Sequence, residues 1–474
     1  MVIPMRTSFA KENVKRELEV FSEEPEEVGW SAADGAMLDL LVPPTVYPPG
    51  EDTAILCESV LALGPGNGRS LLEIGCGSGA ISLWAAMRGF RVSTCDINPL
   101  AVAAVRGRAE EMGLSSGLTV VEGGPGEGEI EQWAQGKHDV IIWNPPYLDP
   151  PTEGEPVLGP LEEAGMVDLD WEQGSGVILL DAIEEGDLLN DDGIVLIIRS
   201  STTIGRYLGE EAIKRGWAQR SAIGITFDDG EHLEVLAFWR PWDARPVEEV
   251  GVISSTNSLM LEQGGEIGRC IRALNQTKGR GQRESKWVSK EGDLLCSWLV
   301  PMNDPGVLQL SAGIALMQSL DSIEIDQDEK INHWMKWPND VWIGKRKFAG
   351  CLAEGKSKGQ ENRFVVGIGA NFMDKDEDFP IATLKHQNRD FQKRLDAALA
   401  GLVESKQGVP DVENDEIINL AWGMMSAGLH NGQVIQLSDK TGSAVGLTNK
   451  AHLLIEFEDG VKEVSTTDGL QFLI

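Results

Sequence analysis

The sequence predicts a multidomain protein: an α/β half with an open, doubly wound sheet, then an α+β half that ends in a small β-barrel. Its length of 474 residues corresponds to about three domains at roughly 150 residues each. In the first half apolar strand-like runs alternate with helical runs, which favours a parallel sheet. The second half has a hairpin pattern at 336–350 and short alternating strands with glycine turns after 431, which favour antiparallel sheets.

A Pro-rich break at 241–246 separates the two halves. We therefore expect five segments, which are an N-terminal extension at 1–34, a doubly wound domain at 35–242, a linker at 243–249, an α+β domain at 250–430 and a small barrel at 431–474.

Composition excludes several classes of protein. No stretch approaches the roughly 20 apolar residues of a membrane helix, and residues 1–20 lack the apolar core of a signal peptide. The 6 cysteines and 6 histidines are scattered without a CxxC pair, so we expect reduced thiols in the cytoplasm and no protein metal site. The net charge of −34 repels nucleic acid, so we expect no DNA partner, although adaptation to a salty cytoplasm explains the charge equally well.

The periodicity of the first half predicts its helices and strands. Residues 1–29 indicate a short helix and a loop, and a Pro-Pro-Gly turn at 48–50 precedes a helical run at 54–63. Strand-like runs are expected at 71–74, 91–95, 118–121, 139–143, 194–199 and 233–240, and helices at 80–87 and 99–112.

A glycine-rich turn follows the first strand of this sheet. Gly75, Gly77 and Gly79 let the backbone turn tightly and approach a ligand beside a helix N-terminus. Asp96 ends the next strand, where a carboxylate can accept both ribose hydroxyls of a nucleoside. The glycine pattern alone also fits dinucleotides.

A second motif, Asn144-Pro145-Pro146-Tyr147, ends a buried strand at the ligand-binding edge of such a sheet. Proline lacks an N–H, so carbonyl oxygens and the Asn144 amide dominate the hydrogen bonding, and Tyr147 adds an aromatic wall. This combination suits a planar amide or aminopyrimidine nitrogen, whose lone pair must be oriented toward an electrophilic methyl group.

Together these motifs resemble the class I S-adenosylmethionine-dependent methyltransferases with a Rossmann-like sheet, over about residues 35–242. The segment Tyr-Pro-Pro-Gly-Glu-Asp-Thr at 47–53 points to the archaeal and eukaryotic branch of the HemK/PrmC type. The resemblance implies N-methylation of a glutamine in a peptide-chain release factor. It implies that the catalytic residues Asn144, Pro145 and Tyr147 hold the glutamine amide and that S-adenosylmethionine is bound by Glu73, Gly75, Gly77, Gly79, Asp96 and Asn144. Relatives often carry an Asp after the third strand, where this chain has Glu122.

The second half is organised around Lys336-Trp337-Pro338-Asn339-Asp340, which leads through a basic turn to Lys347 and Gly350. Three further segments accompany it: Ser-Thr-Asn at 255–257, a Gly- and Arg-containing loop at 279–287, and Gly-Ile-Gly-Ala-Asn at 367–371. Glycine N–H groups and guanidinium forks in such a loop match phosphate oxygens.

In this order the four segments resemble the BirA-type biotin–protein ligases, over about residues 250–474. The resemblance implies that ATP and biotin, with Mg²⁺ on the phosphates, form biotinyl-5′-AMP, and that a lysine of a biotin-carrier domain in a biotin-dependent carboxylase accepts the biotin. It implies that Lys347 is catalytic, that Asp340 orients the incoming lysine and that Arg280 contacts the biotin carboxylate or the α-phosphate. The implied biotin- and ATP-binding residues are Ser255, Thr256, Asn257, Gln276, Gly279, Arg280, Gly281, Arg283, Trp287, Lys336, Asn339, Asp340, Lys347, Gly350 and Asn371.

Two further expectations follow from this resemblance. Relatives often carry Arg, Gly and Arg where this loop has Gln282, Glu284 and Ser285, so we expect weaker retention of the adenylate. Residues 431–474 are expected to form the SH3-like C-terminal domain of the ligases, and the methyltransferase stands where the family has its DNA-binding domain.

Three functional hypotheses remain open at this level. The first is a bifunctional enzyme with a protein methyltransferase and a biotin ligase. The second is an active ligase whose first half only binds S-adenosylmethionine or a protein partner. The third is an adenine-N6 nucleic-acid methyltransferase fused to the ligase, which would need a basic face or a target-recognition domain.

Overall fold

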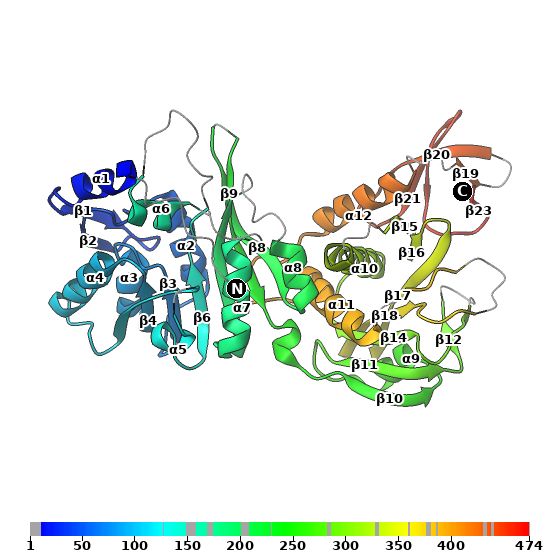
Figure 1. Ribbon diagram of the computed structural model, residues 1–474. Coiled ribbons are helices and arrows are strands. Elements are labelled where there is room, and N and C mark those ends of the chain that lie inside the picture. Colours follow the sequence, from blue (N-terminus) through cyan, green and yellow to red (C-terminus); the bar gives the residue numbers. More distant parts are fainter. Residues whose placement is uncertain are drawn as a thin grey trace. The chain divides into compact units, whose positions relative to one another are not determined.

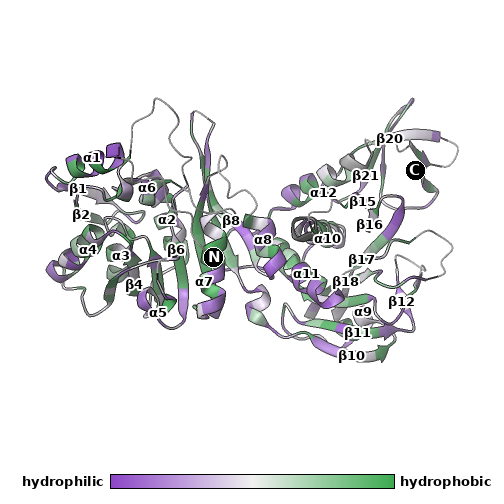
Figure 2. Ribbon diagram, in the orientation of Figure 1, coloured by the Kyte–Doolittle hydropathy of each residue, from purple (hydrophilic) through white to green (hydrophobic). Residues whose placement is uncertain are grey.

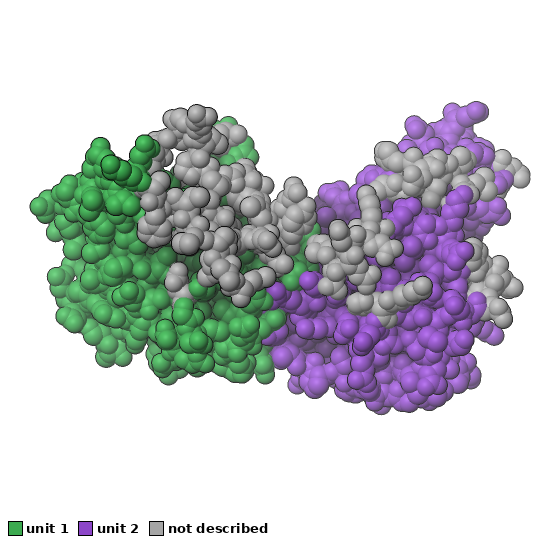
Figure 3. Space-filling model, in the orientation of Figure 1, with its two compact units in different colours: residues 1–212, 220–239, 406–410 green, residues 213–219, 240–405, 411–474 purple. Residues whose placement is uncertain are grey.

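The protein is described from a computed structural model, which covers residues 11–126, 128–147, 158–167, 174–200, 208–228, 230–281, 286–327, 331–358, 361–375, 381–384, 387–429, 434–437 and 440–473. The chain forms two compact units (Figure 3). Unit 1 comprises residues 1–212, 220–239 and 406–410, and unit 2 comprises residues 213–219, 240–405 and 411–474. Among the described residues, no helix combines the length and apolar character that a membrane span requires.

Unit 1 contains a seven-stranded sheet in the order β5-β4-β3-β6-β7-β9-β8 (Figure 1). The strands are β3 (Ser70–Ile74), β4 (Arg91–Asp96), β5 (Leu118–Glu122), β6 (His138–Trp143), β7 (Leu189–Ser200), β8 (Ala218–Thr226) and β9 (His232–Trp239). Strands β5, β4, β3, β6 and β7 are parallel, and β9 runs antiparallel to β7. The predicted doubly wound sheet is therefore present, and its strand order reverses between β3 and β6, where such sheets bind ligands.

The helices described in the first half of the chain follow the predicted alternation. They are α1 (Lys11–Val20), α2 (Glu51–Ala62), α3 (Ala80–Met87), α4 (Pro99–Glu111), α5 (Ile130–Trp133), α6 (Pro160–Met166), α7 (Ser175–Gly186) and α8 (Leu208–Arg215). The parallel strands are buried on both faces, as β6 shows with Val140, Ile141 and Ile142 all fully buried.

One prediction for the N-terminal region was wrong. The acidic stretch before residue 29 was expected to be a loop, but β1 (Glu26–Ser31) pairs antiparallel with β2 (Met37–Val42). Alternate residues of β2 are buried, so Leu38 and Leu40 contribute to the core.

Unit 2 contains a second seven-stranded sheet in the order β10-β11-β14-β18-β17-β16-β15. The strands are β10 (Glu248–Ile253), β11 (Cys270–Gln276), β14 (Leu294–Val300), β15 (His333–Lys336), β16 (Asp340–Ile343), β17 (Arg346–Lys358) and β18 (Glu361–Ala370). The short strands β12 (Gly279–Arg280) and β13 (Lys286–Trp287) form a separate ribbon. The predicted hairpin is confirmed, because β16 and β17 pair antiparallel around the turn at Gly344.

The described helices of the second half are α9 (Thr256–Gln263), α10 (Pro305–Gln327), α11 (Asn388–Val403) and α12 (Asn414–Leu429), with the 3₁₀ turn η3 (Pro241–Ala244) before them. Figure 2 shows the contrast between α10, which is mostly apolar, and α1, which is mostly hydrophilic.

The C-terminal strands form a separate five-stranded sheet in the order β22-β21-β20-β19-β23. They are β19 (Val434–Leu437), β20 (Lys440–Leu447), β21 (Leu453–Phe457), β22 (Gly460–Val464) and β23 (Leu470–Leu473). No pairing between the edge strands β22 and β23 is present among the described residues, so this sheet is open and a closed barrel is not confirmed.

Candidate functional sites

A cavity of about 980 Å³ lies at the carboxyl ends of β3, β4 and β6 in unit 1. Most residues that the sequence predicted for S-adenosylmethionine and its acceptor line it, which are Glu73, Gly75, Gly77, Asp96, Asn144, Pro145 and Tyr147. Gly79 does not line the cavity. It precedes α3 with a φ of 80°, and a Cβ there would lie 2.6 Å from Val105 Cγ2, so its role is close packing of the turn.

Asp96 is held at the end of β4 by backbone donors. The Gly77 N–H donates to Oδ2 at 2.8 Å, and the Asn98 N–H donates to Oδ1 at 2.8 Å. Burial raises the pKa of this carboxyl group, and these hydrogen bonds oppose the rise. Each oxygen keeps a lone pair for a ligand hydroxyl, so the geometry fits the predicted ribose contact.

Glu73 lines the cavity but is almost fully buried. The residue is 5% exposed, and its carboxyl group accepts a short hydrogen bond from Ser82 Oγ on α3. Burial raises the pKa of Glu73 to about 8, so the group is largely protonated at neutral pH. Glu122 does not line the cavity, where the chain instead presents Gly123, Gly124 and Pro125.

The Asn144 corner contains a residue that the sequence reasoning placed only at a helix N-terminus and not in the site. Asp52, at the start of α2, is 3% exposed. Its Oδ2 accepts hydrogen bonds from Asn144 Nδ2 at 2.8 Å, Tyr47 Oη at 3.0 Å and Tyr147 Oη at 3.1 Å. The sequence offered one indication of this role, the place of Asp52 in the Tyr47–Thr53 motif. The contact to Asn144, however, spans 92 residues of sequence.

Asn144 Oδ1 is buried and has no hydrogen-bond partner among the described residues. A buried acceptor without a partner is costly, which makes this atom a candidate ligand contact. The cavity is also lined by Leu161 and Met166 of α6 and by Val167, which follows it. The sequence of the Gly- and Glu-rich loop at 151–165 suggests a substrate entrance, and residues 151–157 of this loop lie outside the described residues.

A second cavity, of about 400 Å³, lies in unit 2. The predicted biotin and ATP residues that line it are Ser255, Thr256, Asn257, Gln276, Arg280, Gly281, Trp287, Lys336, Asn339, Asp340, Lys347 and Gly350. Gly279 and Asn371 are not among the lining residues, and Arg283 lies outside the described residues, as do Gln282, Glu284 and Ser285. Thr467 and Asp468, between β22 and β23, and Phe472 of β23 contribute to the wall.

The floor of this cavity is a network of short polar side chains at the start of α9. Gln276 Oε1 accepts from the Thr256 N–H at 2.7 Å. Ser297 Oγ lies 2.6 Å from Asn257 Oδ1, and Asn257 Nδ2 donates to Glu354 Oε2 at 2.9 Å. The Asn257 amide is therefore held by protein groups at both ends, and Glu354 is a site residue that the sequence reasoning missed.

Two ion pairs hold two of the cationic side chains that line the cavity, Arg280 and Lys347. Arg280 Nη2 lies 2.9 Å from Glu354 Oε1, and Lys347 Nζ lies 2.7 Å from Asp340 Oδ1. The side chains of Lys347 and Asp340 are 19% and 20% exposed, so this pair is mostly shielded from water. A Cβ at Gly350 would lie 3.3 Å from Asp340 Oδ1, so this position leaves the room that the pair occupies.

Trp287 lies between backbone glycines and two ammonium groups. A side chain at Gly369 would clash with its indole ring, which shows how closely the ring approaches β18. Lys347 Nζ is 5.5 Å and Lys375 Nζ is 5.2 Å from the ring centroid. The ring thus has two cation–π contacts, and its buried Nε1 has no partner among the described residues.

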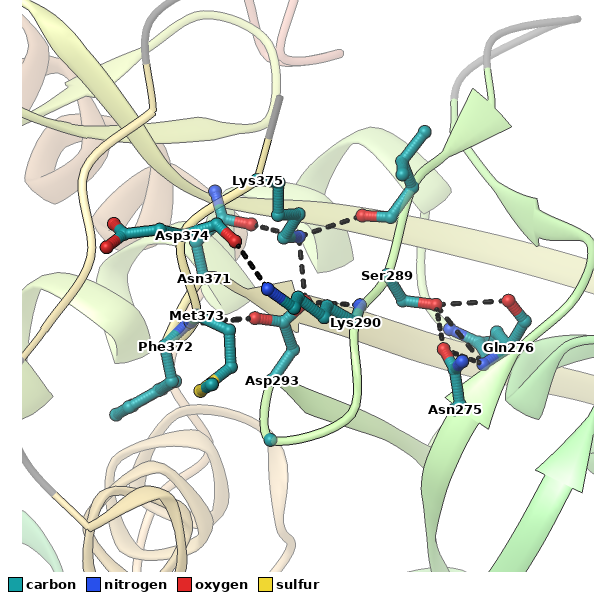
Figure 4. Close-up of polar contacts among 12 residues, drawn as sticks. Asn275, Gln276, Ser289, Lys290, Asp293, Asn371, Phe372, Met373, Asp374 and Lys375 are labelled. Carbon is teal, nitrogen blue, oxygen red and sulfur yellow. Dashed lines mark hydrogen bonds and ion pairs between the residues drawn. The ribbon is translucent and has the colours of Figure 1, made fainter. Parts of the chain in front are cut away.

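Asn371 belongs to a network beside the cavity (Figure 4). Lys375 Nζ donates to Asn371 Oδ1 at 2.6 Å, to Asp293 Oδ2 at 2.7 Å and to the Val288 carbonyl at 2.8 Å. Asn371 Nδ2 donates to the Lys347 carbonyl at 3.2 Å. Asn371 therefore connects the buried Lys375–Asp293 ion pair to the backbone of Lys347. It can position Lys347 without lining the cavity itself.

A protein metal site is not evident in the part of the chain that the structure describes, where no group of three or more His, Cys, Asp or Glu side chains is placed to hold an ion.

Comparisons with known proteins match one family model in each half of the chain. Residues 51–157 match the family model of the methyltransferase small domain, and residues 250–371 match that of the biotin/lipoate A/B protein ligase family. A protein of Methanocaldococcus jannaschii, provisionally named a protein N5-glutamine methyltransferase, is 32% identical over 168 residues, which cover 35% of this chain and 78% of that protein.

Relatives of the second half are similar over a larger share of the chain. The bifunctional ligase/repressor BirA of Bacillus spizizenii is 28% identical over 240 residues, which cover 46% of this chain and 71% of that protein. The solved structure of the biotin protein ligase from Aquifex aeolicus in complex with biotin and ATP aligns at 26% identity with a TM-score of 0.38, and covers 48% of this chain and 98% of that chain.

Proposed function

Because the first half of the chain belongs to the protein N5-glutamine methyltransferase family and the second half to the biotin–protein ligases, we propose that each cavity catalyses the corresponding reaction. Unit 1 transfers a methyl group from S-adenosylmethionine to the side-chain nitrogen of a protein glutamine. Unit 2 attaches biotin to a lysine at the expense of ATP. The observation that carries the first activity is the buried Asn144 Oδ1, which no described residue partners, in a cavity that Asp96 also lines.

The methyl transfer is a substitution at carbon. The glutamine nitrogen forms a bond to the methyl carbon while the carbon–sulfur bond breaks, the electron pair stays on sulfur, and the nitrogen then loses one proton to water. An amide nitrogen is a weak nucleophile because its lone pair is delocalised. Asn144 Oδ1 and the Pro145 carbonyl accept its N–H groups and orient it, which is worth several kcal/mol of alignment, up to about 7–11 in ideal cases.

A peptide-chain release factor is the acceptor we propose for this reaction. The test is to incubate the protein with S-adenosylmethionine and a release factor from the same organism, and to map the product by peptide mass spectrometry. A single added methyl group on a glutamine, absent with Asn144→Ala, is expected. Methylation of another residue type, or none in a preparation that still biotinylates, would refute the assignment.

Unit 2 activates biotin in two steps. In the first, the biotin carboxylate attacks the α-phosphorus of ATP and pyrophosphate leaves, which gives biotinyl-5′-AMP. In the second, the neutral amine of an acceptor lysine attacks the acyl carbon and AMP leaves. Lys347 stabilises the charge that develops on the α-phosphoryl oxygens, and the chain's own role is mainly positioning and electrostatics.

The contacts of the second cavity support distinct roles for its residues. Arg280, held by Glu354, faces the biotin carboxylate or the α-phosphate, and Trp287 provides a stacking surface for the adenine. Mg²⁺ accompanies the phosphates of ATP. Bound there, it would neutralise part of the phosphate charge as a counter-ion.

The acceptor of biotin that we propose is the carrier domain of a biotin-dependent carboxylase, in the cytoplasm, and the charge of −34 supports a protein partner over DNA. The C-terminal sheet corresponds to the ligases' SH3-like domain in our proposal. Its support is a four-stranded meander, β19 to β22, with β23 returning beside β19. We keep the segments 1–34, 35–242, 243–249, 250–430 and 431–474 as proposed domains.

A further inference from the structure

Asp52 determines which end of the Asn144 amide faces the first cavity. A carboxylate oxygen can only accept hydrogen bonds, so the amide group that lies 2.8 Å from Asp52 Oδ2 must be the Nδ2 donor. The Asn144 carbonyl oxygen then points away from Asp52 and remains buried, with no partner in the described parts of the chain. The orientation of Asn144 is thus set by charge and not by the shape of its side chain.

The two tyrosines of the corner are oriented by the same carboxylate. Tyr47 Oη and Tyr147 Oη both donate to Asp52 Oδ2, at 3.0 and 3.1 Å. Burial and the charge of Asp52 raise the pKa of both phenols, so both stay protonated and keep donating across the pH range in which the protein functions. Their hydrogens are therefore committed to Asp52, and only their oxygen lone pairs remain for a ligand.

Asp52 itself is fixed on its other side. Its Oδ1 accepts from the Thr53 N–H at 2.6 Å, in the first turn of α2, where the helix dipole favours a negative charge. A Cβ at Gly50 would lie 2.9 Å from Asp52 Oδ1 and 3.2 Å from Tyr47 Oη, so glycine at this position leaves space for the cluster.

We propose that Asp52 is the positioning and specificity-determining residue of the methyl transfer, because it turns Asn144, Tyr47 and Tyr147 so that this corner presents acceptors alone. This inference rests on the proposed methyltransferase function. The corner then accepts a side chain with two N–H donors, such as a glutamine amide, and rejects the carboxylate of glutamate. Sites whose polar groups would be left unpaired discriminate by factors of about 10⁴.

The test compares Asp52→Asn with Glu51→Gln, which removes an exposed charge from the same helical turn. In Asp52→Asn the new amide can donate to Asn144 Oδ1, so Asn144 can reverse and direct its NH₂ group into the cavity. The expected result is a fall in kcat of about 100-fold, the effect of losing one preorganised contact, with S-adenosylmethionine affinity unchanged by calorimetry and Glu51→Gln like the wild type.

Inhibition by a glutamate-containing competitor tests the specificity role of Asp52, because a purely structural role would leave this inhibition unchanged. The release factor with its acceptor glutamine changed to glutamate is added as a competitor. It should inhibit Asp52→Asn at least about tenfold better than the wild type. Equal inhibition of both, or a kcat of Asp52→Asn within threefold of the wild type, would overturn the proposal, as would a loss of S-adenosylmethionine binding in proportion to kcat.

A measurement without any acceptor separates this inference from the proposed function. The side-chain NH₂ resonances of Asn144, in ¹⁵N-asparagine-labelled full-length protein and assigned with Asn144→Ala, report its partner. They should shift in Asp52→Asn and stay in place in Glu51→Gln. Unshifted resonances in Asp52→Asn would refute the role of Asp52 whatever the wild type methylates. Methylation of a residue other than glutamine would refute the proposed function alone.

Discussion

Replacing Asp340 by Asn separates two roles that the second cavity allows for this residue. The sequence suggested that Asp340 orients the incoming lysine, whereas the structure pairs it with Lys347 at 2.7 Å. Removing one partner of a fully buried ion pair costs about 3–5 kcal/mol. Both side chains are about a fifth exposed, so we take about 2–3 kcal/mol, which converts to a loss of about 30- to 160-fold in rate.

If Asp340 holds Lys347, this loss appears in the first half-reaction. Rapid-quench measurement of biotinyl-5′-AMP formation should show it, while transfer of biotin from added biotinyl-5′-AMP to a carrier domain changes much less. Asp390→Asn, an exposed acid in the first turn of α11, serves as the control and should leave both steps unchanged. Normal adenylate formation with a selective loss of transfer would refute the positioning role and support the lysine-orienting one.

Three further predictions concern the same unit. Burial raises the pKa of Asp396 from its usual 3.8 to about 7. Stability from this group is present below pH ~4 and lost as the pH rises through ~7, by on the order of 4 kcal/mol. Asp396→Asn keeps an acceptor for Trp298 and should therefore gain stability over the wild type in denaturant unfolding at pH 8 but not at pH 4; equal gains contradict this. Glu354→Gln should raise the KM for biotin about fivefold by releasing Arg280 and Asn257, and an unchanged KM in a pyrophosphate-release assay counts against it. Gln282→Arg should release less free biotinyl-adenylate than the wild type, because it restores a positive charge to the loop. Equal release would show that this charge does not retain the adenylate.

Local motifs made much of the fold predictable. The glycine turn at Gly75, the acid at Asp96 and the Asn144 corner each lie within a few residues of a strand end, and a doubly wound sheet brings strand ends to one edge. The hairpin at β16 and β17 was predictable for the same reason, because its turn residue and its flanking strands are adjacent in sequence.

The supporting residues could not be predicted, because their partners are remote in sequence. Asp52 contacts Asn144 across 92 residues, and Asn257 contacts Glu354 across 97. Lys375 and Asp293 likewise form a buried pair from separate loops. Nothing in the residue type or local periodicity distinguishes these acids from the many exposed ones of this acidic chain.

The N-terminal hairpin was missed for a different reason. Glu26 and Glu27 begin β1, although acidic residues are rare in strands, because they pair with β2, whose alternate residues are buried. Tertiary packing outweighs local propensity in this hairpin.

Assaying both reactions in single preparations of three proteins tests the central claim most directly. The wild type should methylate a glutamine of the release factor and biotinylate a carrier domain. Asn144→Ala should lose only the methylation, and Lys347→Ala only the biotinylation, so that each variant controls for the folding of the other. A methyl group that persists in Asn144→Ala, or a wild type that biotinylates without methylating the factor, would contradict the account of two active sites in one chain.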